Sequence, residues 1–268
     1  MTLPADTVAA LAAELDQAER SRTQIPLISR RFPAANLADA YAVQDAWVRL
    51  KLAAGRRRIG WKIGLTSQAM QAALQIDTPD SGVLLDDMQF EDGVTIAPDR
   101  FIQPRVEAEI AFVMKAPLQG PQVGIFDVLN ATDYLVPALE ILDTRVVRRE
   151  PENGAQRTII DTVSDNAANA GLVTGGRPVR VDAVDMRWVG AIVSKNGLVV
   201  ETGLGAGVLN HPATGIVWLV RRLHQIGSGL DAGQIVLSGS FIRPVETQHG
   251  DTISADFGPL GTVSAHFG

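Results

Sequence analysis

The sequence predicts an α+β fold, with a helical N-terminal region at residues 1–58 and a β-rich region at residues 59–268 that together form one compact unit. Apolar residues recur at helical spacing mainly in the first quarter of the chain. After residue 59, short runs rich in β-branched and aromatic residues outnumber the helical segments. These runs do not alternate regularly with helices, which favours a largely antiparallel or mixed sheet over a doubly wound parallel sheet.

Two amphipathic helices are expected in the N-terminal region, the first over residues 5–22. The second places four apolar residues on one face, at positions i, i+3, i+7 and i+10: Ala40, Val43, Trp47 and Leu50. Gly55 is expected to end it. Later helices are expected in SQAMQAAL after Ser67, near residues 126–132, around DTVSDNAANA and over about 207–225.

The expected strands are IGWKIG, RVEAEIAFVM, YLVPALEIL, RWVGAIVS, LVVETG, QIVLSGS, DTISADF and GTVSAHF. Lys195-Asn196-Gly197, between two of these runs, is a hairpin turn signal. The polar residues 146–158 predict a surface loop or hairpin.

The composition excludes several classes of protein. A net charge of −6 and a pI near 5.2 argue against nucleic-acid and acidic-membrane partners. The chain has no cysteine, which excludes disulfides, thiolate nucleophiles and cysteine-ligated metal centres. The first twenty residues lack a basic leader and a continuous apolar core, and nowhere do eighteen apolar residues run unbroken, so we expect a cytoplasmic protein.

Three glutamates are candidate metal ligands. Glu107 and Glu109 lie two apart on an expected strand, so their side chains point to the same side with Cα atoms roughly 6.5 to 7 Å apart. Glu140 lies on the apolar face of another expected strand. Three carboxylates without a neighbouring histidine favour oxygen coordination of Mg²⁺ or Mn²⁺ over zinc. Two alternatives remain open, a solvated strand face for the pair and a structural salt bridge from Glu140 to Arg105 or Arg145.

Lys62 is a candidate ligand-binding residue, because Gly60 and Gly64 flank it on its strand face and leave bare backbone beside the cation. The alternative is an exposed lysine on an edge strand. Thr66 is interpreted first as a helix cap. Asp80 is either a turn residue or a base.

Arg145 either binds a substrate carboxylate bidentately or solvates a turn. Two other motifs are set aside. GLGAG at residues 203–207 lacks the third glycine and the following acidic residue of a dinucleotide loop, and no GxSxG elbow of a serine hydrolase is present.

GWKIGLTS, PRVEAEIAFV, ALEILDTR, SDNAANAG, GVLNHPATGIVWL and GSFIRPV occur in order along nearly the whole chain. In these motifs the chain resembles the 2-oxo acid hydratases of the fumarylacetoacetate hydrolase superfamily. The resemblance implies a β-rich, mixed-sheet roll of that superfamily's C-terminal type and homo-oligomers built from dimers. It implies that Glu107, Glu109 and Glu140 bind Mg²⁺ or Mn²⁺, that Lys62 is the active-site lysine and that Asp80 lies beside the substrate. Thr66 and Ser240, within two of these motifs, are expected to contact the substrate.

Within the family, SDNAANAG and GSFIRPV are similar to the 2-oxo-hept-4-ene-1,7-dioate hydratases. Two positions depart from them, with Trp61 in place of histidine and Ile242 in place of threonine. The expected activity is metal-dependent addition of water to a 2-hydroxy-2,4-dienoate, giving a 4-hydroxy-2-oxo acid in aromatic catabolism. The alternatives are a 4-oxalocrotonate decarboxylase, a C–C bond hydrolase, and a non-catalytic partner in a complex with a decarboxylase.

The expected mechanism assigns a role to each candidate. The metal chelates the C1 carboxylate and the C2 oxygen of the substrate. Lys62, with a lowered pKa, hydrogen-bonds the oxyanionic end or shuttles a proton. Asp80 activates water, and Arg145 holds a second carboxylate.

Overall fold

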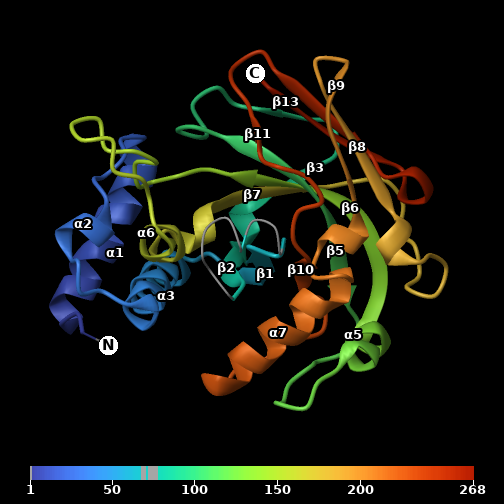
Figure 1. Cartoon of the computed structure of the whole chain (residues 1–268), viewed down its shortest axis with the longest axis horizontal. Coiled ribbons are helices and arrows are strands. Elements are labelled where there is room, and N and C mark those ends of the chain that lie inside the picture. The colour runs from blue at the N-terminus through green and yellow to red at the C-terminus, as the bar shows by residue number, and fades with distance from the viewer. Residues whose placement is uncertain (1, 68–70, 72–77) are drawn as a thin grey trace.

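The computed structural model describes residues 2–67, 71 and 78–268, and Figure 1 shows the arrangement of its elements. The helices are α1 Ala5–Ser21, α2 Ile28–Arg31, α3 Leu37–Ala53, α5 Ile125–Ala131, α6 Ile159–Ser164 and α7 Pro212–Gln225. The N-terminal helices lie at one end of the molecule, and strands β8, β9 and β13 lie at the other (Figure 1). Within the described ranges, no helix is long and apolar enough to cross a membrane.

The strands form two sheets. The first contains eight strands, in the order β2-β1-β10-β5-β6-β7-β3 with β11 added beside β5. Its strands are β1 Arg58–Gly64, β2 Asp80–Leu85, β3 Gln89–Glu91, β5 Arg105–Met114, β6 Thr132–Leu142, β7 Asn169–Thr174, β10 Ile235–Leu237 and β11 Val245–Glu246. The second has the order β4-β13-β12-β8-β9, with strands β4 Val94–Ile96, β8 Gly190–Lys195, β9 Leu198–Leu204, β12 Thr252–Asp256 and β13 Thr262–Phe267. β13 packs against β6 and β7, so the two sheets share one core.

The predicted helices of the N-terminal region are confirmed. α1 and α3 pack against each other, and α3 also packs against α6. Ala40, Val43 and Trp47 are buried as predicted, but Leu50 is 42% exposed. At 100° per residue, ten residues place Leu50 about 80° away from Ala40 around the helix. The predicted stripe was therefore one residue too long.

Asp39 holds the first turn of α3 in place. Its carboxylate accepts the backbone N–H of Asn36, while the Asn36 side chain accepts the N–H of Asp39, so the two form a capping box. The same carboxylate accepts hydrogen bonds from Thr2 and Leu3. Burial alone would raise the pKa of Asp39, but these hydrogen bonds outweigh it and hold the pKa well below its usual range.

We expect Asp39→Asn to lower the free energy of unfolding by about 1 to 2 kcal/mol at neutral pH, the usual loss when a helix cap is removed. The native carboxylate has a depressed pKa, so its contribution is complete above the unfolded value of about 3.9 and disappears as the pH falls through the folded value. Urea unfolding of both proteins at pH 7 and near pH 2 measures the difference. An unchanged difference at low pH would show that the ionised form is not what stabilises the cap.

The predicted strands are all present, and five further short strands accompany them. β2, β3, β4, β7 and β11 were not predicted. The Asn196-Gly197 turn joins β8 to β9 with φ of 54° and 80°, which confirms the hairpin. The segment 146–158 is a hairpin-like loop closed by a bridge between Arg149 and Gln156. The helix expected in SQAMQAAL lies outside the described residues.

Candidate active site

Three glutamates converge on one face of the eight-stranded sheet. β5 and β6 run antiparallel, and their register places Glu107 directly opposite Glu140. Glu109 follows on the same face of β5, because side chains two apart on a strand share a face. Carboxylate oxygens of the three residues all lie within 4.8 Å of one another. The predicted cluster is therefore present.

Each buried carboxylate in the cluster keeps one oxygen without a partner. Glu109 Oε2 accepts the backbone N–H of Gly239 at 2.7 Å, and Glu140 Oε1 accepts Nδ2 of Asn169 at 2.8 Å. Glu109 Oε1 and Glu140 Oε2 are buried and have no hydrogen-bond partner among the described residues. Buried carboxylate oxygens of this kind are costly unless they bind a proton or a cation. The side chains are thus oriented by one oxygen and free to bind through the other.

The acidic groups strongly perturb one another. Burial, followed by repulsion from Glu140, raises the pKa of Glu107 to about 7. Burial and the charges of Glu140 and Glu107 raise the pKa of Glu109 well above its ordinary value. Four carboxylates, counting Asp80, face the single ammonium of Lys62. A divalent cation would reduce this imbalance, and an all-oxygen donor set fits Mg²⁺ or Mn²⁺.

Lys62 is buried beside the cluster. Only 3% of the residue is exposed, so the alternative of an exposed edge-strand lysine is wrong. Its Nζ donates to the Ala167 carbonyl at 3.1 Å and lies 3.4 Å from Glu140 Oε1. The ion partner of Glu140 is therefore Lys62, not Arg105 or Arg145. Burial would lower the pKa of Lys62, but Glu140, Asp80, Glu107 and Glu109 together raise it, so in the protein alone the pKa moves opposite to the expected direction.

Asp80 is buried as the first residue of β2, so the alternative of a turn residue is wrong. Gly64 lies opposite Asp80 in the β1–β2 register and donates its N–H to it. A Cβ at Gly64 would lie 2.2 Å from Asp80 Oδ1 and 2.9 Å from Lys62 Nζ. The Asp80 carboxylate and the Lys62 ammonium therefore both lie close to the backbone of Gly64, where a larger residue would collide with them. Burial raises the pKa of Asp80, while the charge of Lys62 opposes the shift.

The SDNAANAG segment supplies three positioning residues that the sequence did not reveal: Asn166, Ala167 and Asn169. Asn166, Ala167 and Ala168 all have positive φ, between 51° and 60°, a conformation that costs non-glycine residues free energy and concentrates at functional sites. The Asn166 side chain holds this turn against β2 by bonding both N–H and C=O of Val83, at 2.8 and 3.0 Å. The turn thereby presents the Ala167 carbonyl to Lys62 and the Asn169 amide to Glu140.

Thr66 and Gly239 form another wall of the site. Thr66 is buried, and a Cβ on Gly239 would lie 2.1 Å from Thr66 Oγ1. Gly239 also has φ of 113°, so only glycine fits where its N–H reaches Glu109. Ser240 is half-buried, and its hydroxyl accepts the N–H and donates to the C=O of Ile242. The hydroxyl of Ser240 thus takes part in its own turn.

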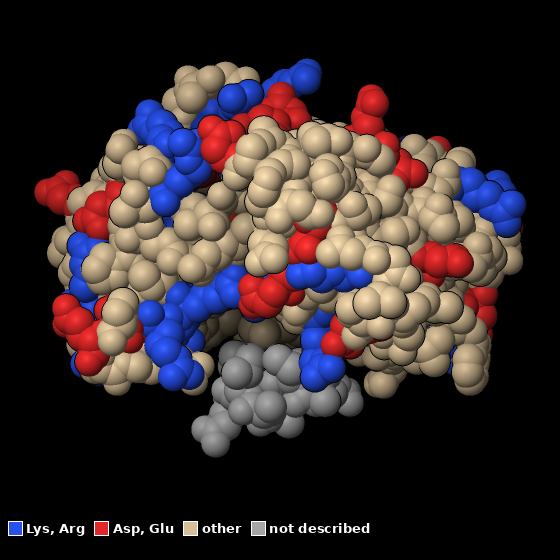
Figure 2. All heavy atoms as spheres, turned by 90° about the horizontal axis from the view of Figure 1, so that it is seen from above, with Lys and Arg blue, Asp and Glu red and all other residues tan. Residues whose placement is uncertain are grey.

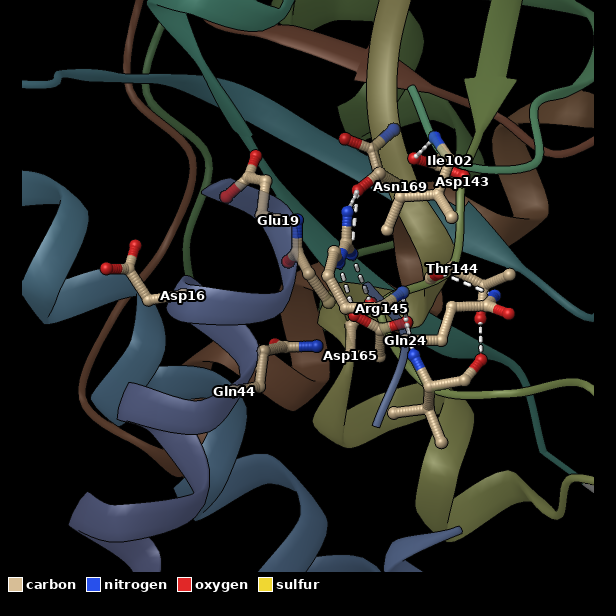
Figure 3. Close-up of polar contacts among 12 residues, drawn as sticks. Asp16, Glu19, Gln24, Gln44, Ile102, Asp143, Thr144, Arg145, Asp165 and Asn169 are labelled. Atoms are coloured by element: carbon tan, nitrogen blue, oxygen red, sulfur yellow. Dashed lines mark hydrogen bonds and ion pairs between the residues drawn. The ribbon is translucent and has the colours of Figure 1, made fainter. Parts of the chain in front are cut away.

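Arg145 lies in a separate buried network (Figure 3). The guanidinium binds the Asp165 carboxylate and carbonyl, reaches the Asn169 carbonyl at 3.1 Å, and lies 5.5 Å from the centre of the Trp47 ring. The Arg145 backbone N–H also donates to Asp165 at 2.8 Å. Both side chains are 1% exposed. This geometry argues against the predicted clamp for a substrate carboxylate, because the guanidinium is enclosed and its donors bind protein oxygens.

One face of the molecule has a recess edged by lysine and arginine side chains (Figure 2), although the net charge of the protein is −6. Figure 2 shows lysine and arginine side chains on both sides of the recess, with acidic side chains beside them.

Comparison with known proteins shows extensive similarity. The chain is 54% identical over 257 residues to the 2-oxo-hept-4-ene-1,7-dioate hydratase of Escherichia coli, covering 96% of each protein. The 4-oxalocrotonate decarboxylase of Pseudomonas putida G7, solved with magnesium and adipate, superimposes with a TM-score of 0.93 at 38% identity, over 99% of both chains.

A more remote likeness concerns the fold alone. The fumarylpyruvate hydrolase of Pseudomonas aeruginosa, in complex with Mn²⁺ and pyruvate, has a TM-score of 0.58 at 13% identity and covers 79% of this chain and 89% of its own. The predicted α+β fold with a mixed-sheet roll is confirmed by these superpositions. No family model matches the chain.

Proposed function

The chain belongs to the family of 2-oxo-hept-4-ene-1,7-dioate hydratases and 4-oxalocrotonate decarboxylases, and on this premise we propose that it hydrates a 2-hydroxy-2,4-dienoate. The best substrate is 2-oxo-hept-4-ene-1,7-dioate or its dienol, and the product is a 4-hydroxy-2-oxo acid of aromatic catabolism. The observation that carries the proposal is the trio of glutamates, whose carboxylate oxygens converge beside Lys62 and two of which keep a buried oxygen without a partner among the described residues.

Glu107, Glu109 and Glu140 would hold the divalent metal, Mg²⁺ or Mn²⁺. When bound, it supplies Lewis-acid stabilisation of negative charge on the substrate's carboxylate and C2 oxygen. The protein's part is to keep three oxygens available and to hold them still. Gly239 and Asn169 do this by bonding the opposite oxygens of Glu109 and Glu140.

Lys62 and Asp80 handle charge and protons. The dienol becomes a 2-oxo-3-enoate when C5 gains a proton and the C2 hydroxyl loses one; water then adds hydroxyl at C4 and hydrogen at C3. Lys62 Nζ, kept protonated by the carboxylates around it, hydrogen-bonds the developing oxyanion or supplies a proton. Asp80, whose pKa is raised by burial, accepts a proton from the attacking water. Thr66 and Ser240 are the further proposed contacts of the substrate.

The direct test follows loss of the dienol's ultraviolet absorbance with the purified chain, Mg²⁺, and five-carbon and seven-carbon dienoates. Hydration consumes the dienol without releasing CO₂. The structural likeness to a 4-oxalocrotonate decarboxylase makes decarboxylation the second candidate. Release of CO₂ from 4-oxalocrotonate without water addition would establish that alternative. A chain that turns over neither substrate would be a non-catalytic partner of a decarboxylase.

We expect Lys62→Met to lower kcat by about a hundredfold to ten-thousandfold, since a positioned proton donor contributes that much. The affinity for Mn²⁺, measured by electron paramagnetic resonance, should stay the same or rise, because the change removes a positive charge beside the carboxylates. Lys115→Met, at an exposed position, is the matched control and should change neither quantity. Loss of Mn²⁺ binding in step with activity would instead show that Lys62 only builds the metal site.

Family membership also supports two broader proposals. The protein forms homo-oligomers built from dimers and works in the cytoplasm, on a small-molecule substrate. A complex with a decarboxylase is compatible with both.

A further inference from the structure

A group of three arginines, Arg105, Arg148 and Arg157, lies beside the glutamate cluster. Arg105 precedes Glu107 by two residues on β5, so the two side chains share a face, with Cα atoms roughly 7 Å apart. A cationic side chain thus shares a strand face with a candidate metal ligand.

The contacts within this arginine group leave donors unused. Arg148 Nη1 donates to Glu246 Oε1 at 2.7 Å, and Arg105 Nε lies 4.0 Å from the same oxygen. Arg157 Nη1 donates to Thr144 Oγ1 at 3.0 Å. The Nε atoms of Arg105 and Arg148 are buried and have no hydrogen-bond partner within the described part of the chain. Buried guanidinium N–H groups without an acceptor are costly, and a bound anion would satisfy them.

The charges around Arg105 also favour binding of an anion. Glu246 is the carboxylate that both Arg105 and Arg148 approach, and its side chain is 67% exposed, so solvent weakens its attraction. Arg105 itself is only 19% exposed. Burial, followed by the neighbouring charges of Arg148 and Arg157, lowers the pKa of Arg105. Positive charge is therefore in excess beside Arg105, because Arg148 and Arg157 add to it and the nearby Glu246 is largely exposed.

Arg157 connects this group to the catalytic side of the site. Its charge acts on Arg105 and also on Asp80, so its guanidinium lies near both groups. Arg105 and Arg157 thus approach the site from different segments, one from β5 and one from the loop after β6.

We infer that Arg105, with Arg157 beside it, binds the second carboxylate of a dicarboxylic dienoate whose first carboxylate lies at the glutamate cluster. This inference rests on the proposed function and deepens it by assigning the preference for a seven-carbon dicarboxylate over a five-carbon monocarboxylate. The role expected of Arg145 passes to these residues.

The test uses adipate as an unreactive dicarboxylate and hexanoate as its monocarboxylate match, with the full chain saturated with Mg²⁺. Calorimetry should show that Arg105→Met weakens adipate binding about 10- to 100-fold, because the loss of one hydrogen bond to a charged group costs about that much affinity. Hexanoate has no second carboxylate, so its affinity should change less than about threefold. Arg243→Met, at a surface arginine paired with Glu201, should alter neither. In turnover, kcat/KM for the seven-carbon dienoate should fall by the same factor and that for the five-carbon dienoate should not.

Glu246→Gln should change the affinity for adipate in the opposite direction. It removes the carboxylate that competes with the ligand for the arginines, so adipate should bind about three- to tenfold more tightly. A merely structural role of the arginine group would not produce tighter binding. If Arg105→Met does not fold, Arg157→Met and Glu246→Gln make the same comparison.

The inference is overturned if Arg105→Met weakens adipate and hexanoate equally, or neither. It is also overturned if the wild-type chain binds adipate no better than hexanoate. Failure of the proposed function has a different signature: no dienoate is turned over by the wild-type chain, whatever the outcome of the adipate measurements.

Discussion

Glu140→Gln should lower the rate of metal-dependent water addition by about a thousandfold or more, the loss of several kcal/mol of charge stabilisation, in a protein that remains folded. The substitution keeps the shape of the side chain and its acceptor for Asn169, but replaces a charged, unpartnered oxygen by an amide. The fold should tolerate the change, because Glu107, Glu109 and Asp80 still surround Lys62 with negative charge.

The measurement pairs dienol turnover with a Mn²⁺ titration and a thermal unfolding curve. Glu201→Gln is the matched control, since Glu201 lies on β9 and its carboxylate pairs with the exposed Arg243, not with a residue of the glutamate cluster. EDTA treatment of the wild-type chain should reproduce the loss, and added Mg²⁺ should restore the activity of the wild type alone. Full activity after EDTA would contradict the metal-dependent scheme.

Arg145→Met should lower the free energy of unfolding by about 3 to 5 kcal/mol, because it leaves the buried Asp165 carboxylate without its cation. The prediction separates the two interpretations of Arg145. A residue that clamps substrate would raise KM and leave stability unchanged. A residue that neutralises Asp165 beneath α1 and α3 should affect the urea midpoint first.

The control for this prediction is the double variant Arg145→Met with Asp165→Leu. Removing both charges of a buried pair is far less costly than removing one, so the double variant should recover much of the lost stability. Urea unfolding of the wild type, both single variants and the double variant measures the coupling. A strictly additive result would mean that the two charges do not stabilise each other.

The fold and the glutamate cluster were largely predictable because their signals are local. Strand alternation places Glu107 and Glu109 on one face, whatever the partner strand. Helical periodicity places Val43 and Trp47 in the core. The close match of several motifs to one family then predicted that Glu140 and Lys62 belong to the same site as Glu107 and Glu109.

The remaining features depend on contacts between distant segments. The Lys62–Ala167 bond and the Asn169–Glu140 bond are made by a turn with positive φ in alanine and asparagine, which propensity disfavours. Arg145 carries no sequence signal that its partner lies twenty residues later, and Arg105 appeared only as a possible partner of Glu140. The three-residue strands β3 and β4 were missed because they are too short to show a periodic pattern.

The short strand β10 must also be in place before the candidate active site can form during folding. It pairs in parallel with β1, matching Lys62 to Leu237, and antiparallel with β5, matching Leu237 to Ala111. The lysine and the glutamates therefore reach their working separation only after a segment near the end of the chain has inserted between their strands. Closing so long a loop is entropically slow, so on the ribosome and in refolding the helical signal should return well before catalysis does.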